Sequence, residues 1–171
     1  MLWHCHLYFR DEKELNTATY KNSDDVSTGS NITNCNNSGN ITFSASVTKR
    51  ANIGGIVALA PAVYNEQGKI SQCYNTGNIH VTSDAAFTAN SCIGGVVART
   101  YINSSGTTTY KMNIDNCGCN YIDEEKKTKP WIKIEGNWSG RCYVAGVVAW
   151  LTTTAGSSLT NLHNNADIIF D

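Results

Sequence analysis

A chain of 171 residues fits one domain, and its formal net charge of −1 leaves no excess of basic residues for nucleic acid or for an anionic membrane surface. Asn, Thr, Ser and Gly make up 66 of the residues, which disfavours helices, whereas 41% of the residues are apolar, which excludes a disordered chain. We therefore expect many short strands joined by polar turns, and no membrane insertion, because the apolar runs are too short to span a bilayer.

The first 30 residues do not share the pattern of the rest. Met1–Arg10 is apolar but lacks a basic region and a small-residue cleavage site, so it does not read as a signal peptide. His4 and His6 would project to one side of an extended strand, which supplies half of a metal site, but no further ligand at a readable spacing completes it. We expect residues 1–30 to form an N-terminal cap or linker.

Residues 31–171 contain a repeat that starts near residues 32, 70, 114 and 159. Its first motif is Ile-x-x-Cys followed by Asn and Gly, as in Ile32 to Ile41 and in Ile70 to Ile79. Its second motif is a Gly-Gly or Ala-Gly pair within an apolar run, at residues 53–58, 93–98 and 144–149. Short β-branched runs flanked by Asn, Gly and Ser indicate strands, and glycine pairs at the centre of each run argue against a helix.

One repeat of about 40 residues thus contains three strand-sized pieces: the Ile-x-x-Cys piece, the piece after Gly-Asn at residues 41–43 and 79–81, and the second motif. This predicts a right-handed parallel β-helix, in which each repeat is one rung and equivalent strands stack roughly 4.8 Å apart. A propeller blade has a similar length, but it needs four strands and a closed ring of blades. Three and a fraction repeats cannot close such a ring. We therefore predict an all-β solenoid of about three and a half rungs.

Stacked rungs would place equivalent residues in columns. Cys35, Cys73 and Cys117 hold a position that is occupied by Leu162 in the fourth repeat, which indicates inward apolar side chains. The alternatives are a vertical disulfide, whose geometry is awkward, and a metal site at Cys117-x-Cys119, which lacks a second ligand pair. The predicted structural ladder consists of Cys35, Cys73, Cys117, Leu162, Asn37, Asn75, Asn164, Gly55, Gly95 and Gly146.

The second motif is apolar at successive positions, so its strand would carry apolar side chains on both faces. One face would fill the coil. We expect the other face to be covered by the N-terminal segment, by a long loop or by another chain.

The run Cys73-Tyr-Asn-Thr-Gly-Asn-Ile79, followed by Ile93-Gly-Gly-Val-Val97, resembles the GLUG-type repeat of large bacterial surface and secreted proteins, including adhesin-like and peptidase-associated ones. The likeness covers about residues 31–170. The sequence departs from the family's usual Gly at Ala58, Ala98 and Ala149. In that family the repeat is a structural module, so the resemblance implies a solenoid, an extracellular or cell-surface setting and no catalytic residues.

Ligand-binding residues are expected in and beside the insert 123–130, which holds six charged residues. Long loops on a rigid scaffold are where binding residues gather, and aromatic rings beside charges suit contacts with sugars or proteins. The alternative is a solvated turn whose Trp packs on the coil. The candidate binding residues are Tyr121, Lys126, Lys127, Trp131 and Trp138.

As a whole, the sequence predicts a non-catalytic structural or adhesion module of a bacterial cell-surface or secreted protein. Its loops, above all 103–109 and 123–138, would present contacts to a glycan or to a host or cell-surface protein. We expect no cofactor, no metal and no nucleic-acid partner. Because the sequence stops after the Ile168–Phe170 strand, we expect this edge to be continued by a longer parent chain or covered by a partner.

The alternative function is that of a carbohydrate-active β-helix enzyme, a polysaccharide lyase or glycosidase, of which this chain is a fragment. Such enzymes need carboxylates or basic residues that converge on one outer strand face. The strand-borne candidates are Arg99, Asp115, Glu135 and Asp167. In the repeat alignment Thr33, Ser71 and Thr160 share the position of Asp115, so we expect no acidic column there.

Overall fold

The computed structural model describes residues 31–45, 50–61, 63–64, 67–87, 89–101, 110–152 and 157–171. The expectations for residues 1–30 and for the loop 103–109 lie outside these residues. All secondary-structure elements among these described residues are β-strands, as the composition predicts.

The strands form five sheets, named A to E here in the order in which the chain visits them. Sheet A contains β1 (Asn31–Thr33), β7 (Gln67–Ser71), β12 (Tyr110–Asp115) and β17 (Ser158–Thr160). Sheet B contains β2 (Asn36–Asn37), β8 (Tyr74–Asn75), β13 (Gly118–Cys119) and β18 (His163–Asn164). Sheet C contains β3 (Ile41–Ala45), β9 (Ile79–Phe87), β14 (Trp131–Trp138) and β19 (Asp167–Phe170).

Sheets D and E complete each rung. Sheet D contains β4 (Asn52–Gly54), β10 (Ser91–Gly94) and β15 (Cys142–Ala145). Sheet E contains β5 (Val57–Pro61), β11 (Val97–Tyr101) and β16 (Val148–Trp150). One short strand, β6 (Val63–Tyr64), pairs antiparallel with β12 and lies outside the regular coil.

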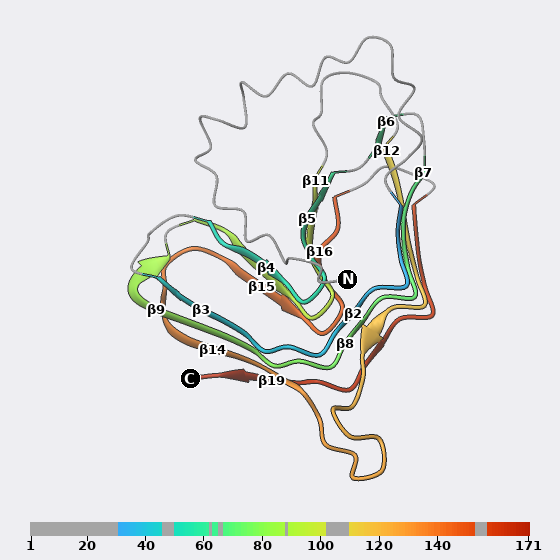
Figure 1. The fold of residues 1–171 in the computed structure, drawn as a ribbon. Coiled ribbons are helices and arrows are strands. Elements are labelled where there is room, and N and C mark those ends of the chain that lie inside the picture. Colours follow the sequence, from blue (N-terminus) through green and yellow to red (C-terminus); the bar gives the residue numbers. More distant parts are fainter. Residues whose placement is uncertain are drawn as a thin grey trace.

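Successive turns of one coil supply the parallel strands of each sheet, which confirms the predicted parallel β-helix (Figure 1). The stacking register is also the one that the repeat indicates. One column in sheet A consists of Ile32, Ile70, Ile114 and Leu159, and the next consists of Thr33, Ser71, Asp115 and Thr160. Because the register follows the repeat, the Ile-x-x-Cys motif fixes which residues of neighbouring rungs touch.

Each complete rung contains five strands, so the prediction of three was wrong. One bend separates sheet A from sheet B, at residues with left-handed backbone: Asn34 (φ 56°), Gln72 (54°), Asn116 (50°) and Asn161 (52°). Asn adopts this conformation at low cost. A second bend follows the first glycine of each Gly-Gly pair and divides the second motif between sheets D and E. Neither bend interrupts the apolar pattern, so the pattern counts each bent segment as one strand.

Viewed down the coil, the rung is bent like an L (Figure 1). Sheets C and D face each other across one arm, around a core that includes Ile53, Ile79 and Ile93. Sheets A and E face each other across the other arm, around a core that includes Ile70 and Val97. The short sheet B lies at the outside of the bend, and the glycine corner lies at the inside.

The glycine corner explains why the second motif is apolar at successive positions. Ile93, before the corner, belongs to the core between sheets C and D, whereas Val96 and Val97, after it, both belong to the core between sheets A and E. All three side chains are fully buried. The residues before and after the corner are therefore covered in the structure, as a motif that is apolar at successive positions requires.

Inward positions are buried in the middle rungs and exposed in the last one. Ile79 and Ile132 are 0% and 1% exposed, whereas Ile168, in the same column, is 39% exposed. Phe170 is 62% exposed and Leu159 45%. Within the described residues, no strand stacks on the outer side of β17 to β19, so these side chains remain open to solvent.

Candidate functional site

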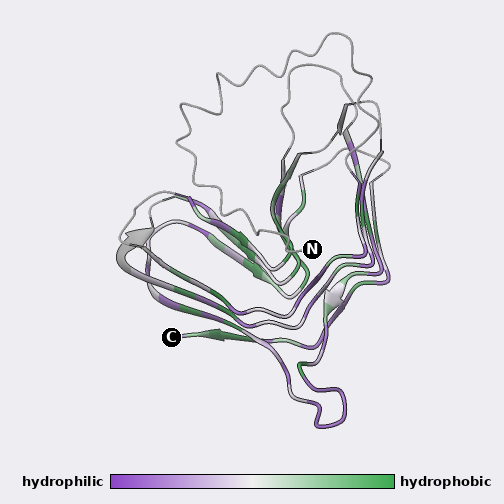
Figure 2. Ribbon diagram, viewed as in Figure 1, coloured by the Kyte–Doolittle hydropathy of each residue, from purple (hydrophilic) through white to green (hydrophobic). Residues whose placement is uncertain are grey.

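The loop 121–130 leaves the coil between β13 and β14 and projects beyond the rungs (Figure 1). Two backbone hydrogen bonds close it into a hairpin: Ile122 N donates to Thr128 O at 2.7 Å, and Thr128 N donates to Asp123 O at 3.1 Å. The Asp123 carboxylate accepts a third bond from Lys126 N at 3.0 Å. The loop is hydrophilic along most of its length (Figure 2). Because it has few apolar side chains to pack, its shape is set by these hydrogen bonds.

Three of the candidate binding residues come together in this hairpin. Lys127 Nζ lies 4.8 Å from the ring centroid of Tyr121, a cation–π distance, and 3.1 Å from Glu124 Oε2. Lys126 Nζ lies 3.1 Å from Asp123 Oδ2, and its side chain is 79% exposed. These exposed pairs hold the side chains weakly and leave them accessible to a partner.

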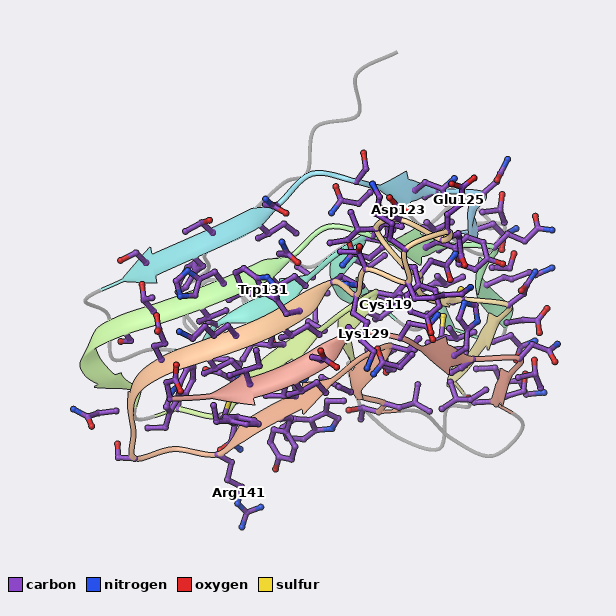
Figure 3. The ribbon with its side chains drawn as sticks, turned by 90° about the horizontal axis from the view of Figure 1, so that it is seen from below. Cys119, Asp123, Glu125, Lys129, Trp131 and Arg141 are labelled. Atoms are coloured by element: carbon purple, nitrogen blue, oxygen red, sulfur yellow. The ribbon has the colours of Figure 1, made fainter. Side chains whose placement is uncertain are left out.

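Trp131 lies at the foot of the loop, on sheet C (Figure 3). Its backbone N–H donates to Asn78 Oδ1 at 3.0 Å, and its ring meets His80 edge-on at 5.7 Å. On the other side, Lys129 Nζ lies 3.1 Å from Asp167 Oδ1 of the last rung. The foot of the loop is therefore tied to the rungs before and after its own.

A row of ion pairs crosses the outer face of sheet C. Glu135 Oε2 lies 2.6 Å from His80 Nε2, and Glu135 Oε1 lies 2.5 Å from Lys133 Nζ. Lys133 Nζ also lies 2.7 Å from Asp171 Oδ2. Hydrogen bonds from Lys133 and His80 hold the pKa of the Glu135 carboxyl below its usual value, and Asp171 and Glu135 raise the pKa of Lys133 to about 12. Both groups stay charged at neutral pH.

Trp138 does not join the other candidates. It is half-buried and packs against the core between sheets C and D. It lies seven positions after Trp131 along the strand, roughly 23 Å away. Gly136 (φ 120°) and a register shift lie between the two, so the even spacing that a regular strand would give is lost. The two Trp rings cannot form one binding surface.

The four candidate residues for catalysis are divided among three sheets. Asp115 in sheet A accepts hydrogen bonds from Thr160 Oγ1 at 2.6 Å and Asn161 Nδ2 at 2.9 Å, and these bonds lower the pKa of its carboxyl. The Arg99 guanidinium in sheet E stacks on Trp150 at 4.7 Å. Glu135 and Asp167 share the outer face of sheet C. The structure brings only the last two to one surface.

The ladder asparagines occupy the inward-facing positions of sheet B. Asn37 Nδ2 of the first rung donates to Asn75 Oδ1 of the second rung at 2.9 Å. Each ladder asparagine also bonds to the backbone two residues later: for example, Asn75 Nδ2 donates to Gly77 O at 2.9 Å. In the third rung Cys119 replaces the asparagine and interrupts the column between Asn75 and Asn164. These side chains are engaged in holding the turn.

The described cysteines are free thiols. Cys73 and Cys117 are fully buried, and Leu162 packs against the same core. Burial raises the pKa of Cys92 and of Cys119 to about 11, and burial, followed by the neighbouring Cys92, raises that of Cys142 to about 12. Such thiols are poor nucleophiles at neutral pH. In the part of the chain that the structure describes, no group of three or more His, Cys, Asp or Glu side chains is placed to hold a metal ion.

The sequence did not indicate a hollow of about 350 Å³ on the outer side of sheet B, where polar side chains of three rungs meet. It is lined by Asn36, Asn37, Ser38, Tyr74, Thr76 and Asn120. The available signal was Gly118, which occupies the outward position held by Asn36, Tyr74 and His163 in the other rungs. A missing side chain in an otherwise filled column changes the outer surface.

No helix among the described residues is long and apolar enough to cross a membrane. Comparison of the chain with protein-family models, with curated proteins and with solved structures finds no match.

Proposed function

We propose that this chain is a non-catalytic structural or adhesion module that presents its 121–130 loop, with Trp131 at the foot, to a glycan or to a surface protein. By its GLUG-type resemblance, we place it in a bacterial surface or secreted protein. One observation carries the proposal: a charged, exposed hairpin with a Tyr and a Trp is anchored to a rigid stacked coil. The backbone of such an anchored loop loses little conformational freedom when a partner docks.

The anchoring contacts support this function because they lie at the foot of the loop and leave its outer part open. Trp131 N is bonded to Asn78 and Lys129 is paired with Asp167, so the two neighbouring rungs fix the loop's direction. Lys126 and Lys127 remain exposed, with side-chain exposures of 79% and 65%. Figure 3 shows Asp123, Glu125 and Lys129 of the loop set apart from Trp131 on its strand, and it shows the Arg141 side chain pointing away from the body.

The test is binding of the labelled wild-type chain to glycan and surface-protein arrays. A double variant, Lys126→Glu with Lys127→Glu, reverses the charge of the hairpin, and Lys69→Glu with Lys111→Glu makes the same charge change on sheet A, where both lysines are exposed. The proposal requires that a hit is lost in the first variant and kept in the second. An equal loss in both variants, or no hit on either array, contradicts it.

One observation favours the enzyme alternative. Glu135, Asp167 and Asp171 share the outer side of sheet C with Lys133 and His80, which brings carboxylates and basic groups to one strand face. Their pairing argues against it, because each charge is neutralised by its neighbour, and the lowered pKa of Glu135 makes this carboxyl a poor general acid. A hydrolysis and lyase assay on polysaccharides, with Glu135→Gln as the variant, decides between the two functions.

A further inference from the structure

The hollow on the outer side of sheet B is a separate surface from the loop. Its lining comes from two adjacent columns, Asn36 with Tyr74, and Ser38 with Thr76 and Asn120, together with Asn37. These residues belong to three successive rungs, so the coil itself positions them. At about 350 Å³, the hollow falls at the lower end of the range of small-molecule sites, which extends from about 300 to 1,000 Å³.

The aromatic wall of the hollow is held in place. Tyr74 Oη donates to Asn116 Oδ1 at 2.7 Å, and the Tyr74 ring lies 5.8 Å from the imidazole of His163. These two rings meet because Gly118 lies between them in the outward column: a Cβ on Gly118 would lie 2.7 Å from His163 Nε2. The same imidazole nitrogen contacts Asn120 Oδ1. Tyr74 and Asn120 are therefore oriented before any ligand arrives.

Hydrogen-bonding groups remain available beside the aromatic ring. Among the described residues, the Asn36 and Ser38 side chains make no hydrogen bond, and both residues are exposed. The Asn120 amide NH₂ stays available because the contact with His163 uses its oxygen. The hollow thus offers two amide groups and a hydroxyl beside an aromatic ring.

The lining carries no charged side chain, which determines the class of ligand. An ionic ligand would find no counter-charge, and an apolar ligand would cover amides and hydroxyls without satisfying them. A neutral sugar ring has hydroxyls for the amides and a C–H face for an aromatic ring. We propose that this hollow, formed by Asn36, Ser38, Tyr74, Thr76 and Asn120, is a binding site for a neutral saccharide unit.

This proposal goes beyond the function of the 121–130 loop, since none of the residues that line the hollow belongs to that loop. A single sugar unit in an open site binds weakly, with a dissociation constant on the order of 1 mM. The probes are neutral hexasaccharides built from glucose, mannose, galactose or N-acetylglucosamine. Binding is read from the side-chain amide NMR signals of Asn36 and Asn120 in the intact chain.

Two variants remove the site in different ways. Ser38→Arg fills the hollow from an exposed position that makes no hydrogen bond, so the fold is retained. Tyr74→Ala removes the aromatic wall, whereas Tyr74→Phe keeps the ring and loses only the bond to Asn116. Thr33→Arg, also exposed and in the same rung but on sheet A, is the matched control.

The proposal expects saturable shifts of both amide signals with at least one hexasaccharide. The affinity should fall at least tenfold in Ser38→Arg and Tyr74→Ala and stay within twofold in Thr33→Arg and Tyr74→Phe. It is overturned if no probe shifts the signals up to its solubility limit, or if Ser38→Arg and Thr33→Arg bind alike. The double variant Lys126→Glu with Lys127→Glu should bind the hexasaccharide normally, so failure of the loop proposal and failure of this one are distinguishable.

Discussion

Gly146 lies so close to Asn164 that a Cβ on the glycine would be 2.0 Å from Asn164 Cγ. Gly55 meets Asn75 in the same way, and Gly95 meets Cys119, with distances of 2.8 Å and 2.3 Å for the corresponding Cβ. In each case the glycine at the inside of the bend faces the inward residue of the next rung's sheet B. The L-shaped rung therefore depends on these three glycines, since a side chain there would push the corner away from sheet B.

The first prediction follows for Gly95→Ala. The added methyl would lie 2.0 Å from Gly146 O and 2.3 Å from Cys119 Sγ, and the backbone oxygen cannot move without shifting the next rung. We expect a loss of about 1–3 kcal/mol in the free energy of unfolding, measured by urea denaturation. Gly39→Ala is the control, because its Cβ would meet Asn37 Oδ1 at an ordinary 3.5 Å. Equal effects of the two substitutions would refute the role of the corner.

The second prediction concerns the interruption of the asparagine column. Cys119 stands in register with Asn75 and Asn164, which face their own corner glycines in the same way. Cys119→Asn should therefore be accommodated, with a change in unfolding free energy within about 1 kcal/mol. Cys119→Leu, which overpacks the bend, should cost about 1–3 kcal/mol. If the asparagine destabilises as much as the leucine, the third rung has a different shape from its neighbours.

The sequence repeat predicted the coil and its register but not the shape of the rung. The alignment of Ile32 with Ile70 and Ile114 is visible because each rung repeats the same inward position, and stacking converts that repeat into contacts. The bends at Asn34 and Gly55 were not counted because a bend leaves the order of apolar residues unchanged. Periodicity reports which residues are inside and cannot report the angle between consecutive strands.

The same limit applies to the candidate sites. The hairpin residues Tyr121 and Lys127 were found because charge and aromatic content are local properties of the sequence. Trp138 was grouped with Trp131 because both are near the insert, but the bulge at Gly136 and the core contact of Trp138 are tertiary features. The hollow at Tyr74 depends on residues of three rungs, so no local motif marks it.

The third prediction concerns the buried thiols. Cys73 is 0% exposed and its Sγ lies 3.3 Å from Ser71 O, while the neighbouring Cys117 thiol and burial raise the pKa of the Cys73 thiol above its ordinary value. Cys73→Ala should lower the free energy of unfolding by about 2 kcal/mol or less, as a small core truncation does. The thermal midpoint of the wild type should be the same with and without reductant. A drop in reductant alone would show that a disulfide stabilises the chain.

The fourth prediction is a pH dependence at Glu135. Its pKa is lowered in the folded state by Lys133 and His80, so its ion pairs stabilise the fold above the unfolded carboxyl pKa of about 4.3. This stability is lost as the pH falls through the folded pKa. Glu135→Gln should therefore lower the urea midpoint at neutral pH and have a smaller effect in acid. Glu125→Gln is the control, because no ion pair of Glu125 occurs among the described residues, and it should show neither effect.

The fifth prediction tests whether the 121–130 hairpin is shaped by its own hydrogen bonds. Asp123 Oδ1 accepts from Lys126 N at 3.0 Å, and the Lys126 side chain pairs with the same carboxylate. Asp123→Ala should speed hydrogen exchange of the Lys126 amide by about 2- to 10-fold, which corresponds to the net worth of one exposed hydrogen bond. The unfolding free energy of the coil should not change, because the hydrogen bonds and the ion pair that the carboxylate makes with described residues all lie within the loop. Glu125→Ala is the control: it changes the residue directly before Lys126 and should leave the exchange rate of the Lys126 amide unaffected. If Asp123→Ala instead destabilises the whole chain, the loop is part of the cooperative fold, and the separation of scaffold from presented loop is wrong.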